Sequence, residues 1–312
     1  MLGGALIEVF DWSAIFWVNV PVGLTGLVVT LAHVRESRDP NARRLDFGGA
    51  AFASAALFCL TLGLVETDDH AWTSAFTLGF LGAALVLGAA FLVFEARHGE
   101  PMLPLDFFRV RQFTVANSDY ALMYAALTGM LFFVSLYFQN VKGFSALETG
   151  ISWMTMNVPF LLVSPLAGRL QARFGARQVV STGALLGGLG VLSFSLLGTD
   201  SSFGQAVPGY LLVGLGYGTA APAISAVAMG AIGVERAGVA SGVLNTARQV
   251  GSAVGLAALG SIATAVAAGP LRDADDLVSG MRVAMLVAGG LALAASVLTV
   301  VAEPGAGRPA AA

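Results

Sequence analysis

The stretch that decides the fold runs from Ser74 to Glu95 and reads SAFTLGFLGAALVLGAAFLVFE. It contains 21 residues without a charge before Glu95 ends it, and it lacks the apolar–polar alternation of a half-buried strand. A helix needs about 20 apolar residues to cross the hydrocarbon core of a bilayer. Because lipid offers backbone groups no hydrogen-bond partner, such a segment must satisfy its own backbone as a helix. The stretch therefore predicts a transmembrane helix.

Similar apolar runs recur along the whole chain. Fifty-six per cent of the residues are hydrophobic and only 11% are charged, whereas a soluble domain has about 25% charged residues. The sequence thus predicts an all-α integral membrane protein. Met1–Val9 is apolar but too short to cross, so we expect the chain to begin inside a helix, as a fragment or from a start codon assigned too late. Nine full spans are expected: 13–33, 47–66, 74–95, 112–138, 149–167, 178–197, 206–230, 237–267 and 281–301.

The composition also excludes several classes of function. With 16 Lys and Arg against 19 Asp and Glu, and no basic block, the chain is not expected to bind nucleic acid. Cys59 is the one cysteine, and the three histidines form no ligand-spaced pair, so no metal site is predicted. The one lysine, Lys142, lies outside any phosphate-binding loop motif, and no enzyme motif is present. We expect no catalysis and no cofactor.

The basic residues predict the orientation. One set of alternate loops contains three of them: Lys142, Arg272 and Arg282. The other set contains twelve: Arg35, Arg38, Arg43, Arg44, Arg97, Arg109, Arg111, Arg169, Arg173, Arg177, Arg236 and Arg308. Lys and Arg concentrate in cytoplasmic loops, so we expect a multi-pass cell-membrane protein with a cytoplasmic C-terminus. The start of the first span is then outside, and an odd number of preceding spans would restore a cytoplasmic N-terminus.

Two polar features stand out in the span 112–138. One helical face carries Asn117, Tyr120, Tyr124, Thr128 and Ser135. Polar groups at membrane depth usually face a cavity or another helix. The face is therefore either the wall of a substrate cavity or a set of interhelical hydrogen bonds. Asp119 points roughly to the opposite side. It is a candidate for proton coupling, and packing against a neighbouring helix is the alternative.

The span 237–267 carries a charge near mid-depth. Arg248 lies about 17 Å along the helix at 1.5 Å per residue, and it shares a face with Ser241, Asn245, Gln249 and Ser252. Arg248 therefore predicts either an inter-helix clamp or a substrate-contacting or gating residue. Gly251-x-x-x-Gly255 on the same span indicates close helix packing. Tyr217 in the span 206–230 has a similar ambiguity, because an aromatic beside small residues suits a cavity wall or ordinary packing.

Four short motifs lie at the ends of these spans. The stretch 12–23 contains Trp12, Ile15, Phe16, Asn19, Pro21 and Gly23 in the order Trp-x-x-Ile-Phe-x-x-Asn-x-Pro-x-Gly. The stretch 168–177, GRLQARFGAR, contains Gly168, Leu170, Arg173, Gly175 and Arg177. The others are LPLDFFR at 103–109 and ERAGVASG at 235–242, which is followed by NTARQVG at 245–251.

Together these motifs resemble the fourteen-helix drug:proton antiporters, the EmrB/QacA-like branch of the major facilitator superfamily. The resemblance implies that Met1–Val9 is the tail of helix five and that helices one to five are missing. It divides the chain into a remnant of the N-terminal half (1–46), two extra linker helices with a loop (47–111), a complete six-helix C-terminal half (112–302) and a cytoplasmic tail (303–312).

The resemblance also implies a function, namely proton-coupled export of amphipathic drugs or natural products by a longer chain. The energy source would be the proton gradient. Gly168, Arg173, Gly175, Arg177, Asn19, Pro21 and Gly23 would serve conformational change. Arg248, Asn245, Gln249, Asn117, Tyr120, Tyr124 and Tyr217 would line the substrate cavity or gate. The alternatives are a non-transporting membrane scaffold and an inactive truncated product.

Overall fold

The computed structural model describes residues 13–33, 46–65, 73–98, 101–267 and 273–302. Within these residues the regular structure is helical throughout, and eight helices are long and apolar enough to cross a membrane. The prediction of an all-α multi-pass membrane fold is therefore confirmed. Met1–Val9, Trp12, the arginines of the loop 34–45, His70, Arg272 and the tail 303–312 lie outside the described residues.

The helices follow the predicted spans closely, and most extend a few residues beyond them. The N-terminal ones are α2 (Ala14–Trp17), α3 (Asn19–His33), α4 (Phe47–Val65) and α5 (Ala75–Arg97). The remaining ones are α6 (Arg111–Leu136), α7 (Ala146–Ser152), α8 (Met154–Val163), α9 (Ala167–Phe174), α10 (Ala176–Ser193), α11 (Phe203–Ile232), α12 (Ala237–Val266) and α13 (Ala274–Ala302). A short π-helix, Tyr137–Val141, extends α6.

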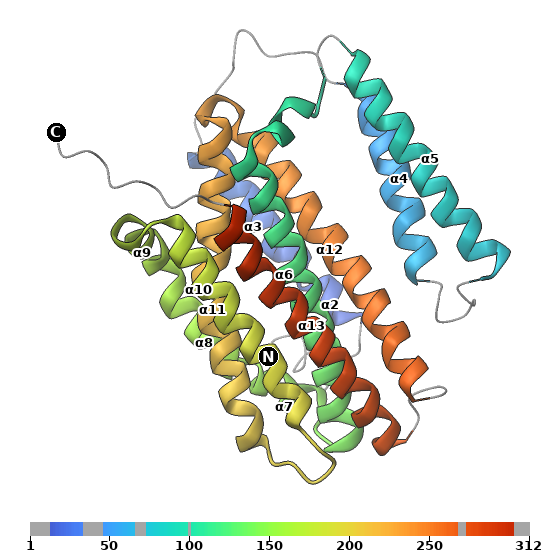
Figure 1. Ribbon diagram of the computed structural model, residues 1–312, viewed down its shortest axis with the longest axis vertical. Coiled ribbons are helices and arrows are strands. Elements are labelled where there is room, and N and C mark those ends of the chain that lie inside the picture. The colour runs from blue at the N-terminus through green and yellow to red at the C-terminus, as the bar shows by residue number, and fades with distance from the viewer. Residues whose placement is uncertain (1–12, 34–45, 66–72, 99–100, 268–272, 303–312) are drawn as a thin grey trace.

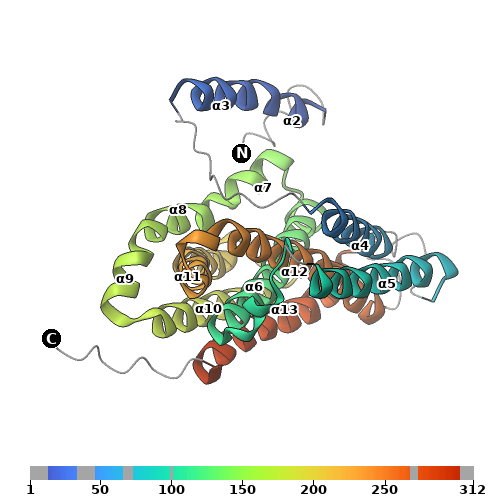
Figure 2. The same cartoon turned by 90° about the horizontal axis from the view of Figure 1, so that it is seen from above.

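The helices from α6 onward form one bundle. Viewed from above, α8, α10 and α12 surround α11, and α6 lies between α12 and α13 (Figure 2). The α4–α5 hairpin stands beside this bundle and touches it through α12 (Figure 1). Helices α2 and α3 lie apart from it, and α3 has no buried residue. The motif residues Asn19, Pro21 and Gly23 are consequently exposed.

Two predicted spans are interrupted, and a proline lies at or near the breaks in each. Pro21 lies in the first turn of α3, where its ring prevents the hydrogen bond to the carbonyl of Trp17, so α2 and α3 separate at this point. The predicted span 149–167 is built from α7, α8, a 3-10 turn at Ser164–Leu166 and α9, with Pro159 inside α8 and Pro165 in the turn. The second interrupted span still runs as one crossing from Ala146 to Phe174. In the first, α3 has 15 residues and is shorter than a membrane-crossing helix, so the described residues contain eight of the nine predicted full spans.

Side-chain contacts of basic residues lie at the two opposite ends of the bundle. At one end, Arg236 lies 3.8 Å from Asp106, and Arg111 donates a hydrogen bond to the carbonyl of Val301. At the other end, Lys142 donates to the carbonyl of Thr199, and Arg282 donates to that of Ser195. Arg111 and Arg236, at the first end, belong to the set of loops with twelve basic residues. Lys142 and Arg282, at the second end, belong to the set with three.

One of the close helix crossings in the bundle joins α6 to α12. A Cβ atom placed on Gly251 would lie 2.3 Å from the carbonyl oxygen of Ala121, and one on Gly255 would lie 2.5 Å from the Cα of Ala125. The small-residue motif thus lets the two backbones approach each other. In contrast, no other described part of the chain comes within 4 Å of the Cβ position of Gly238 on the same helix.

This contrast gives a matched pair of substitutions. Gly251→Ala should destabilise the protein by about 1–3 kcal/mol, since the added methyl group overlaps backbone that cannot move away easily. Gly238→Ala should be neutral or stabilising by up to about 1 kcal/mol, because alanine favours the helix and fills open space. Unfolding in lipid nanodiscs, followed by circular dichroism, measures both. Equal stabilities for the two variants would contradict the close crossing.

Candidate functional site

A cation and a group of tyrosines meet between α6 and α12. The guanidinium carbon of Arg248 lies 5.4 Å from the ring centroid of Tyr124. The rings of Tyr120 and Tyr124 are 4.8 Å apart in an edge-to-face arrangement. All three side chains are half-buried. We refer to Arg248, Tyr120 and Tyr124 as the Arg248 cluster.

Local sequence explains how the cluster forms. Tyr120 and Tyr124 are four residues apart on α6 and therefore stack along one face. The hydroxyl of Thr128, one turn further on, donates to that of Ser252 on α12 at 2.9 Å. Ser252 is in turn one helical turn after Arg248, and Gly251 brings the two backbones together. The crossing thus holds Arg248 over the tyrosine face.

The guanidinium of Arg248 retains unused hydrogen-bonding capacity. Its Nε atom is buried, and among the described residues it has no hydrogen-bond partner. No carboxylate in the described ranges forms an ion pair with it. An arginine near mid-span is costly unless its charge is compensated, and a tyrosine face compensates it by cation–π attraction worth about 0.5–2 kcal/mol. The cluster can accept an additional polar or anionic group from a ligand.

The predicted polar neighbours divide into exposed and buried residues. Asn245 and Gln249 lie on the same face of α12 as Arg248 and are exposed. Asn117 precedes Tyr120 by one turn and is 7% exposed. Its amide nitrogen donates to the carbonyl of Phe113 at 2.8 Å, and its buried Oδ1 has no partner among the described residues. Amide groups therefore extend the cluster along both helices.

Tyr217 lies next to the cluster but inside the helix packing. It is 2% exposed, its hydroxyl donates to the carbonyl of Met123, and its ring is 6.3 Å from that of Tyr124. Gly187 on α10 leaves room for the ring. In this structure Tyr217 therefore packs beside Tyr124 within the helix contacts. This arrangement agrees with the packing alternative for its helix face. Its expected place in a pocket wall stays a prediction.

Asp119 faces α13 instead of the cluster. It is 1% exposed, and the hydroxyl of Thr299 donates to its Oδ2 atom. A cavity of about 10 Å³ adjoins both side chains and is otherwise lined by apolar residues of α6, α10 and α11. A cavity of this size accommodates about one water molecule. The structure thus places the acid where its helix phase predicts, against a neighbouring helix.

The sequence motif at 168–177 lies on α9 and α10. Gly175 joins them with φ +88°, a backbone conformation that suits glycine. Arg173 is exposed, with its guanidinium carbon 5.2 Å from the Phe174 ring. Arg177 is half-buried and Gly168 is exposed. The motif therefore forms a tight turn with arginines around it.

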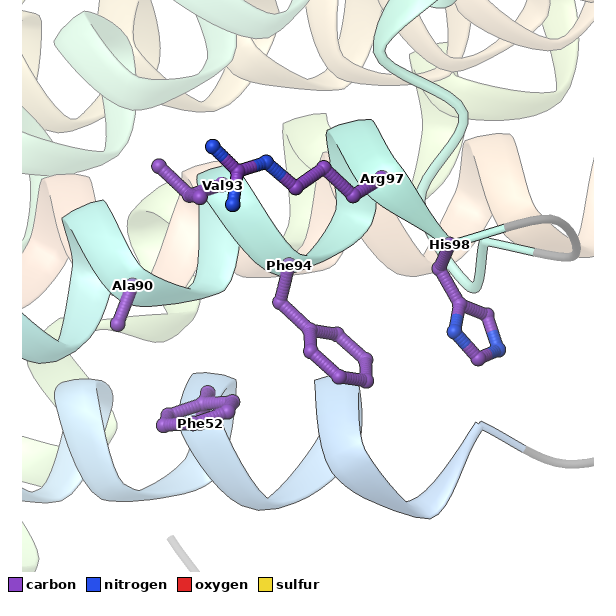
Figure 3. A pocket seen from close by; sticks show the side chains of 6 residues that line it. All are labelled: Phe52, Ala90, Val93, Phe94, Arg97 and His98. Carbon is purple, nitrogen blue, oxygen red and sulfur yellow. The ribbon is translucent and has the colours of Figure 1, made fainter.

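Two features were not predicted from the sequence. Trp153, between α7 and α8, packs against the core, and its indole Nε1 is buried without a partner among the described residues. The signal in the sequence that could have pointed to Trp153 is the presence of a tryptophan inside an apolar span. A pocket of about 340 Å³ also lies between α4 and α5 (Figure 3). It is lined by Phe52, Ala90, Val93, Phe94, Arg97 and His98. It depends on how two helices pack, which no motif encodes.

Comparison with known proteins agrees with this architecture. Residues 1–256 match the model of the Major Facilitator Superfamily. The chain is 34% identical over 252 residues to the tetracenomycin C resistance and export protein of Streptomyces glaucescens, covering 80% of this chain and 47% of that protein. It is 35% identical over 250 residues to the multidrug resistance protein Stp of Mycobacterium tuberculosis, covering 80% and 46%.

A methylenomycin A resistance protein of Streptomyces coelicolor is 29% identical over 250 residues, covering 80% of this chain and 52% of that protein. The chain therefore spans about half the length of the curated relatives it matches. The match to the family model over most of the sequence, together with the bundle of membrane-spanning helices, shows that the chain belongs to the major facilitator superfamily.

Proposed function

We propose that this chain is the C-terminal part of a proton-coupled exporter of amphipathic drugs or natural products, in the fourteen-helix EmrB/QacA-like branch. It would act in the cell membrane with a cytoplasmic C-terminus and would confer drug or antibiotic resistance by efflux. The names of its relatives, which refer to resistance and export, support this proposal. The four motifs that resemble the branch support the finer assignment.

The observation that carries the proposal is the Arg248 cluster. A buried guanidinium nitrogen without a partner among the described residues, stacked on tyrosine and flanked by exposed amides, suits an amphipathic ligand. The tyrosine rings would contact a flat apolar body, and the guanidinium with Asn245 and Gln249 would bind its polar groups. Binding sites for small molecules commonly combine aromatic walls with a few placed polar groups.

The proposal includes helices that the chain does not contain. Alternating access requires two halves that rock around a central site. In the proposed organisation, 112–302 is one half, 47–111 contributes two linker helices, and 1–46 belongs to the other half. Helix α3 has no buried residue and the chain covers about half of its relatives, which supports this organisation. The coding DNA upstream of Met1 would then encode further spans in frame.

The energy source in this proposal is the proton gradient, without a cofactor. Asp119 remains the proton-coupling candidate within the chain. Its contact with Thr299 on α13 would let a change in protonation alter the α6–α13 contact. The main rivals are a non-transporting scaffold and an inactive truncated product. Tyr217 and the Thr128–Ser252 bond, which fill the helix contacts, favour the scaffold, whereas exposed Asn245 and Gln249 favour the exporter.

A substitution of Arg248 tests the proposal directly. In the full-length protein that carries this chain, Arg248→Ala should reduce proton-driven efflux by about tenfold, as expected for the loss of a desolvated cation–π contact of about 1–2 kcal/mol. Arg248→Lys should restore the charge but only part of the activity, because an ammonium does not stack as a planar guanidinium does. Efflux of a fluorescent amphipathic cation or anion from energised vesicles provides the measurement.

Thr246→Ala, on the opposite face of α12, is the control. Unchanged efflux in Arg248→Ala would remove the residue from the mechanism and favour the scaffold.

Substitutions of Tyr124 test whether the ring acts through Arg248. Tyr124→Phe should keep most of the efflux activity, since the aromatic face remains, whereas Tyr124→Leu should lose about as much as Arg248→Ala. The double variant Tyr124→Leu/Arg248→Ala should be little worse than either single variant, because coupled residues are not additive. Fully additive losses in the vesicle assay would show that the two side chains act independently.

A further inference from the structure

Two acidic side chains meet at one end of the α4–α5 hairpin, outside the Arg248 cluster. Asp46 lies directly before α4, and Glu95 lies in the last turn of α5. Glu95 is only 2% exposed. A buried carboxylate is costly unless it is paired or hydrogen-bonded. The partners of these two groups therefore decide their charge state.

Each carboxyl group has one oxygen that a backbone group satisfies. The N–H of Gly49 donates to Asp46 Oδ1 at 2.8 Å, and the N–H of Leu103 donates to Glu95 Oε2 at 3.2 Å. The other two oxygens, Asp46 Oδ2 and Glu95 Oε1, are buried and have no hydrogen-bond partner in the described part of the chain. The site thus contains two unsatisfied acceptor atoms.

These two oxygens face each other. A Cβ atom placed on Gly49 would lie 2.5 Å from Asp46 Oδ2 and 2.6 Å from Glu95 Oε1, so both oxygens converge on the same point. The two side chains are also within hydrogen-bonding range of each other. Ionised carboxylates only accept hydrogen bonds, so this contact becomes a bond only when one group carries a proton. Gly49 is the residue that leaves space for it.

The surrounding helix packing fixes this geometry. The ring of Phe94 lies between α5 and α4 (Figure 3), and a Cβ atom on Gly48 would lie 2.6 Å from that ring. Gly48 therefore lets the ring of Phe94 seat against α4, while Gly49 makes room for the carboxyl pair. The consecutive glycines draw the two helices together at the end where the acids meet.

A metal ion fits this site poorly. Within the described ranges, no group of three or more His, Cys, Asp or Glu side chains is placed to bind one, and hard cations take six or more oxygen ligands. The N–H groups of Gly49 and Leu103 also point their positive ends at the carboxyls. Among the described residues, the titratable neighbours that act on Glu95 are Asp46 and His98, and the His98 ring stacks on Phe94 at 5.1 Å. Figure 3 shows the Arg97 side chain running back along α5 toward Val93.

We propose that Asp46 and Glu95 bind one proton between them and that this proton holds the end of the α4–α5 hairpin closed. The shared proton joins the start of α4, the end of α5 and, through Leu103, the segment that leads to α6. Removing it places two negative charges in a buried contact, which drives the helix ends apart. The site is independent of the Arg248 cluster and does not rest on the proposed transport function.

The test is infrared difference spectroscopy of the 312-residue chain in lipid nanodiscs, comparing the unsubstituted chain with Asp46→Asn and with Glu95→Gln. Each single variant should lose the carbonyl absorption of one protonated carboxyl per chain. An amide donates its own N–H to the remaining carboxylate, which then needs no proton. Buried Asp119 is present in every sample, so its contribution cancels. Asp106→Asn, whose side chain is 63% exposed, should leave the absorption unchanged.

Retention of the absorption in Asp46→Asn would overturn the proposal, because Glu95 would then be protonated without its partner. Absence of a difference between the unsubstituted chain and Glu95→Gln would also overturn it. Gly49→Ala keeps both acids but inserts a methyl group between the oxygens, so it should lose the same absorption, and retention there would contradict the geometry. Helix content by circular dichroism verifies that each variant is folded. If an amide variant does not fold, the glycine variant decides.

Discussion

The interior of a lipid bilayer supplies no hydrogen bonds, and this constraint governs the whole structure. It makes the long apolar segments into helices, and it forces polar side chains within them to find partners in the protein. Thr128 donates a hydrogen bond to Ser252, Tyr217 donates one to the carbonyl of Met123, and Thr299 donates one to Asp119. Where the described residues supply no partner, as at Arg248 Nε and at the facing oxygens of Asp46 and Glu95, the protein retains capacity for a ligand. We propose a substrate group for the first position and a proton for the second.

Most of the fold was predictable from the sequence, because an uncharged run such as Ser74–Phe94 has one stable conformation in lipid. The interruptions of the predicted helices were harder to locate. Pro21 breaks a predicted single helix into α2 and α3, whereas Pro159 lies inside α8 without ending it. The difference arises from position in the helix and from neighbouring contacts, which a sequence window does not contain. Likewise, Gly238-x-x-x-Gly242 and Gly251-x-x-x-Gly255 have the same spacing on α12. Of Gly238 and Gly251, only Gly251 lies close to another described helix.

The candidate site was predictable as a pattern but not as a set of contacts. Helical periodicity placed Tyr120 and Tyr124 on one face and Asp119 on the other, and the structure shows that arrangement. Helical periodicity did not predict that the guanidinium of Arg248 would lie over the ring of Tyr124 or that Tyr217 would pack against α10. Those outcomes depend on the relative rotation of three helices. The pairing of Asp46 with Glu95 has the same origin, because nearly fifty residues separate two groups that only helix packing brings together.

The proposed function requires the face of α12 that carries Asn245 and Gln249 to line an aqueous substrate path. Cysteine accessibility measures this directly, in a background where Cys59 is replaced by alanine. Asn245→Cys and Gln249→Cys should react with a membrane-impermeant thiol reagent, and an exported compound should protect them. Leu85→Cys, on the exposed apolar face of α5, should not react. If the two α12 positions were as unreactive as Leu85→Cys, that face would contact lipid or a dry helix interface, and the transport interpretation would be wrong.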